Sequence, residues 1–318
     1  MKIQSFFLLL TNFLYPVSFA QHGSVESDKE PTPQEIQAVY SKANSSPEEL
    51  SSVRALKISE QFLGKPYKGG PCGEGSSGNF EPKPQACLTS FDCTTYVEAV
   101  LALAISRDQG PNCSDSFWKI FREIKYCDSK EISYKNRNHF VEIHWCANQN
   151  KKGFLKDLTL SLFPEAPEQT KWINTDSWIG DKITALKEDP NIPDEEKTKK
   201  LEELQKASPN FSNESQKGAL RYIPLSELTK SEIIEKIKAE KILVFNLVKD
   251  KHTKNPKIPV MVSHQGFIVE KQGVLYIRHA SPAKDAMSVV DVPFETYISE
   301  RMKDTTWPTL GFNLQKIQ

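Results

Sequence analysis

The chain has 318 residues, of which 38% are hydrophobic and 26% charged, and its 41 basic and 41 acidic side chains leave no formal net charge. This composition is typical of a folded globular protein and excludes wholesale disorder, a collagen-like repeat and a bundle of membrane spans. A chain without net charge also lacks the basic surface that binds nucleic acid, so we expect no nucleic-acid partner.

The N-terminus has the pattern of a cleaved secretory signal. An apolar run from Phe6 to Leu14 is followed by Ser18 and Ala20, small residues that predict cleavage after Ala20. The alternative is a membrane anchor, but the run is shorter than the roughly 20 apolar residues that a spanning helix needs. We therefore expect residues 1–20 to be a signal peptide and the mature chain to be exported, periplasmic or secreted, with no membrane partner.

The rest of the chain predicts helices first and strands later, an order typical of an α+β fold. Residues 21–47 are polar and are expected to form a tether, and the Lys/Glu-rich stretch 148–218 is expected to be a charged helical insertion. Apolar residues at helical spacing predict helices at 48–63, 91–106, 116–126 and 226–239. A period of two predicts strands at 241–248, 263–269 and 274–280.

Six cysteines lie in the first half of the chain: Cys72, Cys87, Cys93, Cys113, Cys127 and Cys146. Export permits disulfides, although their connectivity cannot be read from sequence. Cys72 and Cys87 flank a loop rich in Gly, Ser and Pro, where a bridge would contribute about 3 kcal/mol. Zinc is the competing interpretation, but His139, His144 and Cys146 have no recognised ligand spacing, so no metal is expected.

Cys93 has the clearest chemical signal. It follows Asp92, a favourable N-cap residue, and helical periodicity begins just after it. In the first turn of a helix, unpaired backbone N–H groups and the helix dipole favour negative charge. We therefore expect a lowered thiol pKa and a nucleophilic thiolate. The alternative is a structural cysteine, either bridged or buried in the core.

Two histidines, one in each of the last two predicted strands, are candidates for the base that this thiol needs. If the turn between the strands has an even number of residues, His264 and His279 point to one face, because side chains alternate with period two. A Lys271–Gln272 turn would place them directly opposite, and a Gln272–Gly273 turn would place them diagonally, in both cases about 5–8 Å apart. An odd turn without a bulge would separate them.

Several strings in the chain together resemble the NlpC-type cysteine peptidases of bacterial cell walls, which are papain-like in fold. They are GKPYKGG around Tyr67, DCTTYVE (Asp92–Glu98), SHQG (Ser263–Gly266) and RHAS (Arg278–Ser281). With the NRNHF segment (Asn136–Phe140) and Trp145, they resemble more narrowly the N-acetylmuramoyl-L-alanine amidase-like branch. Relatives generally carry DCTTFVE, so Tyr96 is a departure. The resemblance covers roughly 50–147 and 219–312.

The resemblance implies a papain-like core formed by 48–147 and 219–318, with N-terminal helices packed on an antiparallel sheet, and a Cys–His–His triad. Cys93 would be the nucleophile, His264 the base and later the acid, and His279 the orienting residue, with the Tyr67 hydroxyl at the oxyanion. The residues expected to bind substrate are Asp92, Thr94, Arg137, Asn138 and His139. No cofactor is needed, and a monomer acting on peptidoglycan fragments is expected.

The implied reaction is hydrolysis of the amide between N-acetylmuramic acid and L-alanine, with anhydro-muropeptides as the preferred fragments. One alternative is cleavage between D-glutamate and the diamino acid of the same polymer. A second is a metal-dependent amidase that uses His139, His144 and Cys146. A third is an exported binding module in which Cys93 is locked in a disulfide.

Overall fold

The computed structural model describes residues 30–71, 85–106, 110, 112–174, 180, 183–184, 186–190, 192–207, 215–255 and 260–318. It confirms a mixed α+β chain in which helices pack on an antiparallel sheet. The predicted signal peptide lies outside these residues. Within the described ranges, no helix is both long and apolar enough to span a bilayer.

The helices and strands follow one another as the sequence order predicts, with helices concentrated before residue 152 and most strands after residue 215. The helices are α1 (Pro33–Ala43), α2 (Ser51–Glu60), α3 (Cys93–Ile105), α4 (Cys113–Lys125), η1 (Tyr134–Asn136), η2 (Val141–Trp145), α5 (Cys146–Lys151), α6 (Thr159–Leu162), α8 (Asp194–Ala207), α9 (Leu225–Leu228), α10 (Ser231–Ala239) and α11 (Phe294–Met302). The strands are β1 (Leu155–Asp157), β2 (Glu168–Ile173), β3 (Gln216–Arg221), β4 (Ile223–Pro224), β5 (Ile242–Lys249), β6 (Val262–Lys271), β7 (Val274–Ser281), β8 (Ser288–Pro293) and β9 (Thr309–Ile317).

Part of the predicted tether is a packed helix. The Thr32 hydroxyl accepts from the Glu35 backbone N–H, and the Glu35 side chain accepts in return from the Thr32 N–H. This capping box starts α1, whose Ile36 and Tyr40 are buried against the other N-terminal helices. The polar composition hid this helix because only one narrow stripe of it is apolar.

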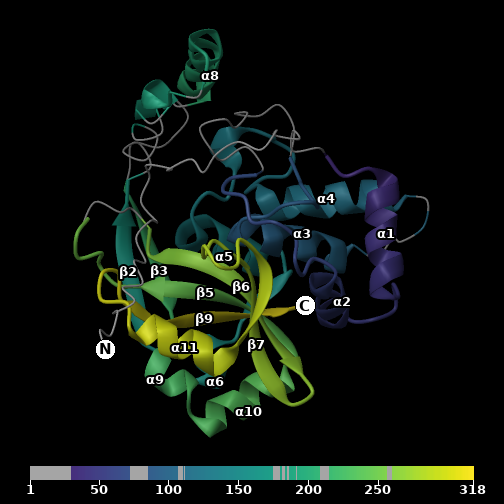
Figure 1. Cartoon of the computed structure of the whole chain (residues 1–318), viewed down its shortest axis with the longest axis vertical. Coiled ribbons are helices and arrows are strands. Elements are labelled where there is room, and N and C mark those ends of the chain that lie inside the picture. Colours follow the sequence, from purple (N-terminus) through teal and green to yellow (C-terminus); the bar gives the residue numbers. More distant parts are fainter. Residues whose placement is uncertain are drawn as a thin grey trace, which may run out of the picture.

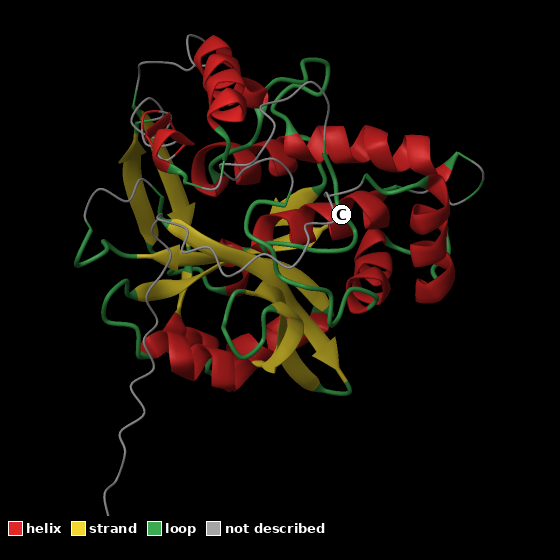
Figure 2. Ribbon diagram, turned by 45° about the horizontal axis from the view of Figure 1, so that its top comes forward, coloured by secondary structure: helices red, strands yellow, loops and turns green. Residues whose placement is uncertain are grey.

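The main sheet has the strand order β1-β9-β5-β6-β7-β8, with β4 also paired to β9, and every pairing is antiparallel. Helices α1–α4 gather on one side of this sheet and α6, α9, α10 and α11 on the other (Figures 1 and 2). Each side has its own buried apolar cluster. We call these sides the α3 face, which includes Val244 and Phe267, and the α11 face, which includes Phe245 and Ile268.

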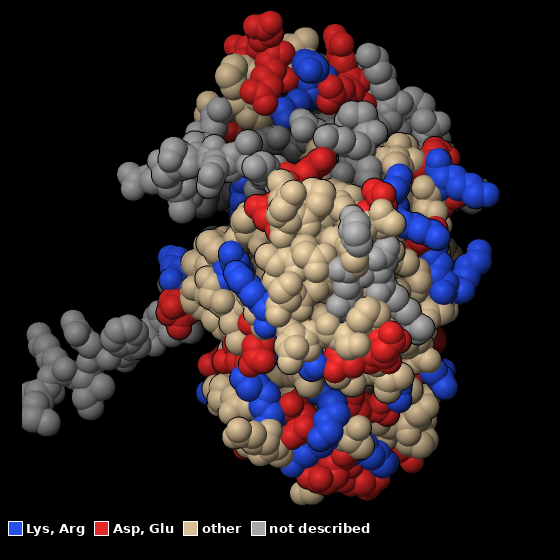
Figure 3. Space-filling model, turned by 90° about the vertical axis from the view of Figure 1, so that its right-hand side faces the viewer, with Lys and Arg blue, Asp and Glu red and all other residues tan. Residues whose placement is uncertain are grey.

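The stretch 148–218 is not helical throughout. β1 pairs with β9 and extends the main sheet, while β2 and β3 pair into a separate two-stranded sheet. The charged helix α8 follows, with Asp194, Glu195 and Glu196 in its first turn. It projects at the top of the molecule, where Figure 3 shows acidic and basic side chains intermixed. The predicted insertion thus combines elements that complete the core with one that stands away from it.

Candidate active site

Cys93 lies at the first position of α3, as the sequence predicts. The Asp92 carboxylate accepts from the Thr95 backbone N–H at 2.8 Å, and the Thr95 hydroxyl accepts from the Asp92 N–H at 3.0 Å. The Gly70 N–H donates to the other Asp92 oxygen at 3.2 Å. These bonds fix where the helix starts, and they occupy the Asp92 carboxylate that we expected to bind substrate.

The Cys93 thiol is free and hydrogen-bonded to the sheet. The Gln265 backbone donates to its sulfur, in the part of β6 beyond the last β6–β7 pair, Phe267–Arg278. Burial, and secondarily the charge of Asp92, raises the pKa of Cys93 to about 12. The expected lowering of this pKa is therefore wrong, because desolvation of the thiolate outweighs the helix N-terminus. The resting residue is a neutral thiol, free of the disulfide that the binding-module alternative required.

His264 and His279 lie on one face of the hairpin, in the diagonal arrangement expected for a Gln272–Gly273 turn. Lys271 pairs with Val274, and Gln272 and Gly273 adopt φ values of 53° and 83°. Nε2 of His264 lies 2.7 Å from Nδ1 of His279, and the two rings are perpendicular. Burial lowers the pKa of His279 to about 4 and that of His264 well below 6.5, so both imidazoles are neutral.

Three contacts bring the thiol and the histidine pair to one place. Gln265, whose backbone is bonded to the Cys93 sulfur, directly follows His264. The Tyr297 ring of α11 packs on His279 with centroids 5.4 Å apart. Burial, and to a lesser degree the neighbouring Cys93, raises the pKa of Tyr297 to about 12. The thiol thus reaches β6 from the α3 face, while the imidazoles approach from the α11 face.

Tyr67 lies beside the start of α3. Its backbone bridges to Phe91, and its N–H donates to the Met287 carbonyl at 2.8 Å. The flanking Lys68 N–H donates to Phe91 O at 2.9 Å, so this segment runs alongside the residues that precede Cys93. The half-buried Tyr67 belongs to this segment, and the role of its hydroxyl at the oxyanion stays a prediction.

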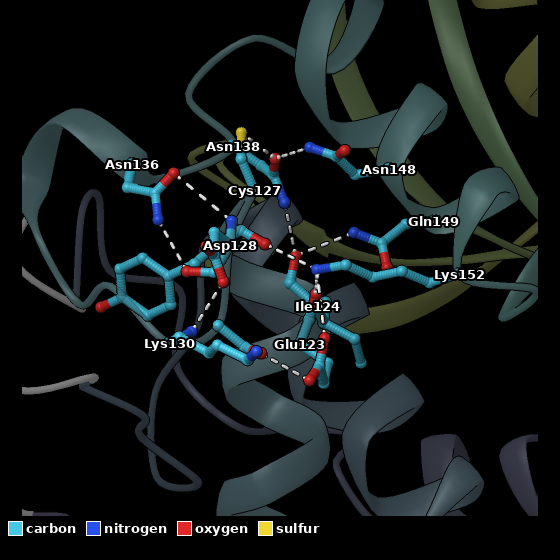
Figure 4. Close-up of polar contacts among 12 residues, drawn as sticks. Glu123, Ile124, Cys127, Asp128, Lys130, Asn136, Asn138, Asn148, Gln149 and Lys152 are labelled. Carbon is cyan, nitrogen blue, oxygen red and sulfur yellow. Dashed lines mark hydrogen bonds and ion pairs between the residues drawn. The ribbon is translucent and has the colours of Figure 1, made fainter.

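Arg137 and Asn138 are 2% and 8% exposed. The Asn138 amide donates to the Ile124 carbonyl at the end of α4, and its oxygen accepts from Asn148 and from the Cys127 thiol (Figure 4). Nearby, Gln149 donates to the same Ile124 carbonyl, and Lys152 donates to the Glu123 carbonyl. These bonds satisfy the free carbonyls at the α4 C-terminus, a structural task. Their contact with substrate stays a prediction.

His139 packs its ring edge-on against Tyr134, and its Nε2 lies 2.5 Å from the Tyr134 carbonyl. His144 contacts Phe140, and the Cys146 sulfur accepts from the Asn246 amide at 3.3 Å. These three side chains therefore have separate protein partners. In the ranges that the structure covers, no three His, Cys, Asp or Glu side chains are grouped to hold a metal ion.

The predicted Cys72–Cys87 bridge falls partly outside the described residues, because Cys72 is not among them. Cys87 is buried and free, with its sulfur 3.1 Å from the Thr89 hydroxyl. Sequence reasoning also missed two groups. Tyr297, on a helix that carried no motif, contacts His279. Asn246 interrupts an otherwise apolar strand and is fully buried, a signal that a polar network crosses the sheet.

Comparison with known proteins assigns the chain to a family. The model of the AmiA-like, N-acetylmuramoyl-L-alanine amidase-like family matches residues 57–306. No curated protein matches the chain. A solved Legionella pneumophila structure of the DUF1460 family is 26% identical, with a TM-score of 0.74, over 90% of this chain and 94% of that one.

Two more distant neighbours share the fold. An N-acetylmuramoyl-L-alanine amidase from Bacteroides uniformis is 19% identical, with a TM-score of 0.54, over 84% of this chain and 99% of that one. A candidate xylanase from Bacteroides fragilis is 21% identical, with a TM-score of 0.56, over 81% and 99%. Because the activities given for these two proteins differ, the fold alone does not decide the reaction, which has to be argued from the site.

Proposed function

This chain belongs to the AmiA-like, N-acetylmuramoyl-L-alanine amidase-like family, and we propose that it is an exported cysteine amidase of peptidoglycan fragments. The bond cleaved would be the amide between N-acetylmuramic acid and L-alanine. One observation carries the proposal. The Cys93 sulfur is hydrogen-bonded to the backbone of Gln265, the neighbour of His264, and Nε2 of His264 lies 2.7 Å from Nδ1 of His279. The NlpC-type, papain-like ancestry and the 1–20 signal peptide remain predictions that agree with it.

The proposed reaction begins from a neutral thiol and neutral imidazoles. His264 must present an unprotonated Nδ1 to the thiol, so its Nε2–H donates to Nδ1 of His279, and His279 in this way holds the tautomer. As Nδ1 takes the proton, the sulfur attacks the lactyl carbonyl carbon and the C=O π electrons move to oxygen. First-turn N–H groups of α3, with the Tyr67 hydroxyl, are suited to stabilise this oxyanion.

The intermediate then collapses with loss of the amine. The imidazolium of His264 gives its proton to the alanine nitrogen as the C–N bond breaks, which leaves a thioester on Cys93. Water, deprotonated by the same imidazole, attacks the thioester, and the imidazolium returns that proton to the departing sulfur. The released muramic acid carboxyl group loses its own proton to solvent. All groups return to their starting protonation, and no step needs a cofactor.

Raised thiol and lowered imidazole pKa values support this order of events. A preformed thiolate–imidazolium pair would be costly where both groups are buried. A neutral pair costs less at rest, and substrate carbonyl and backbone donors stabilise the charge only as it develops. Proton transfer and attack are therefore expected to be coupled.

The test is mass spectrometry of purified anhydro-muropeptides incubated with the mature chain. We expect free anhydro-muramic sugar and intact stem peptide from the wild type, and no product from Cys93→Ala. Cys127→Ala is the matched control, because Cys127 is also a partly buried free thiol, and it should retain activity. An active Cys93→Ala protein would overturn the mechanism, especially if a chelator then stopped it.

The runner-up function uses the same residues on another bond of the polymer, between D-glutamate and the diamino acid. Nothing in the described chain separates the two bonds, because Cys93, His264 and His279 would do the same chemistry on either. The product masses separate them, since the endopeptidase would leave L-alanine attached to the sugar. A shortened peptide would replace the amidase assignment while preserving the role of Cys93.

A further inference from the structure

A row of buried amides crosses the α3 face of the sheet and ends beside Cys93. The Thr94 hydroxyl donates to the Gln265 side-chain oxygen at 2.9 Å, and Gln265 Nε2 donates to Asn246 Oδ1 at 2.8 Å. Asn246 Nδ2 donates to Asn313 Oδ1 at 3.0 Å, and Asn313 Nδ2 donates to the Asp157 carboxylate at 2.7 Å. The register places Gln265, Asn246 and Asn313 directly across from one another on β6, β5 and β9.

The direction of every hydrogen bond in this row is fixed from its Asp157 end. The carboxylate and the Arg221 carbonyl accept only, so the NH₂ group of Asn313 must face them, at 2.7 and 3.0 Å. Asn313 therefore turns its oxygen to Asn246, and each following amide takes the same orientation. Gln315 reinforces the anchor, because its Nε2 donates to both the Asp157 carboxylate and the Asn313 oxygen.

At the end of the row opposite Asp157, Gln265 is hydrogen-bonded to two groups beside each other, the Thr94 hydroxyl and the Cys93 sulfur. The single hydroxyl hydrogen of Thr94 is committed to Gln265, so Thr94 Oγ1, 3.9 Å from the Cys93 sulfur, can act toward the thiol only as an acceptor. Gln265 also donates its backbone N–H to that sulfur. The residue at the end of the row thus holds the nucleophile through its main chain and Thr94 through its side chain.

We propose that this amide row is a positioning device, in which Asp157, three strands away, fixes the orientation of Thr94 and of the β6 backbone around Cys93. The inference rests on the proposed function, because it assigns Cys93 the nucleophilic role. Three strand spacings separate the ends by about 14 Å. Asp157 is exposed whereas Gln265, Asn246 and Asn313 are buried, so the row runs from the surface to the site.

Asp157→Asn removes the anchor without removing a buried group. The present carboxylate accepts from the Thr159 N–H on one oxygen and from Asn313 on the other. A carboxamide has only one oxygen, so it must place its NH₂ against either the Thr159 N–H or the amide of Asn313. Either arrangement opposes two donors, so that only the Arg221 carbonyl and the Gln315 amide still hold Asn313. The preference of the amides from Asn313 to Gln265 for a single orientation is therefore weakened. In the molecules whose row has reversed, the Thr94 hydrogen can donate to a thiolate.

Two readouts test this on the full chain. Alkylation of Cys93 by iodoacetamide at pH 8 should be about threefold faster in Asp157→Asn, because a new hydrogen bond stabilises the thiolate. Removal of one charge about 14 Å away would change the rate by no more than about 1.7-fold through water-like dielectric. The kcat for muropeptide hydrolysis should fall about tenfold with KM within about twofold, because the nucleophile is held less firmly.

The titratable groups around the sulfur are unchanged in this variant: Asp92 at the cap of α3, His264 and His279 on β6 and β7, and Tyr297 on α11. Asp128→Asn is the matched control. Asp128 accepts from the Lys130 N–H at 2.9 Å, as Asp157 does from Thr159 at 2.8 Å, but it belongs to no row. This control should behave as wild type in both assays.

A second pair of variants covers the inner end of the row. Thr94→Val should reproduce the loss of kcat, and Thr94→Ser, which retains the hydroxyl, should restore it. Wild-type alkylation and kcat in both Asp157→Asn and Thr94→Val would overturn the positioning role. The failure of the proposed function looks different: an active Cys93→Ala protein would remove the nucleophile itself, whatever the alkylation rates show.

Discussion

The two faces of the sheet treat strand β6 in opposite ways. On the α3 face, Gln265 joins a row of amides in which each donor has an acceptor. On the α11 face, His264 lies among aromatic rings and has another imidazole as its hydrogen-bond partner. In the proposed mechanism, successive residues of one strand thus serve positioning and proton transfer. Side-chain alternation alone is enough to separate these two tasks along a strand.

The largest effect should come from the α11 face. His264→Ala removes the group that takes the thiol proton in the proposed mechanism, and we expect kcat/KM to fall about 10³-fold. The measurement is muropeptide hydrolysis, with folding checked by circular dichroism. His252→Ala, which removes an imidazole from the loop after β5 that contacts Trp307, should stay near wild type. Comparable losses in both variants would mean that the histidine pair has no special role.

Acid should destabilise the same face. The pKa of His279 is lowered from 6.5 to about 4, so the unfolded chain binds a proton more readily than the folded one. This contribution, about 3 kcal/mol, is fully present above pH 6.5 and is lost as the pH falls toward 4. Melting temperatures across this range should fall less steeply in His279→Asn. Parallel curves for variant and wild type would contradict the assignment.

Gly266→Ala tests how tightly the α11 face is packed. A Cβ there would lie 2.8 Å from His279 Cβ, the Arg278 carbonyl and the Phe245 ring. We expect a loss of about 1–3 kcal/mol of stability from overpacking, and about tenfold lower kcat because His279 is displaced. Gly180→Ala, where a Cβ meets open space, is the control. Full activity in Gly266→Ala would show that the ring position tolerates movement.

The smallest effect should come from the α3 face. Tyr96 donates its buried hydroxyl to the Ser59 carbonyl at 3.0 Å. Tyr96→Phe should cost about 1 kcal/mol in urea unfolding and leave kcat unchanged, since the ring keeps its edge contacts with Phe62, Phe91 and Phe267. A marked loss of kcat with normal stability would break the division between the two faces.

Local patterns carried most of what could be predicted. Asp92 followed by helical periodicity located the start of α3, and the period-two strands with an even turn placed His264 and His279 on one face. Both features depend on residues close in sequence. The thiol pKa could not be predicted in this way, because it depends on burial, which arises from the packing of residues far apart in sequence.

The amide row was beyond sequence reasoning for a related reason. Asn246 is a single polar residue in an apolar run, whereas Gln265 and Asn313 lie in strands with other polar residues. Only strand pairing, across 67 residues between Asn246 and Asn313, aligns them. Likewise, the NRNHF string marked Asn138 without showing that its amide is used at the end of α4. A motif identifies residues that matter, but the contacts decide whether they hold structure or substrate.

The two-residue turn at Gln272–Gly273 constrains which sequence changes this hairpin can accept during evolution. Gly273 has φ near 83° and Gln272 near 53°, so the tip accepts a limited set of residues, of which Asn and Gly are the most favourable. Substitutions that respect these dihedral angles leave the strands in place. Insertion or deletion of a single residue would instead turn the side chains of β7 to the opposite face relative to β6. We therefore expect this turn to tolerate insertions or deletions only when they add or remove two residues.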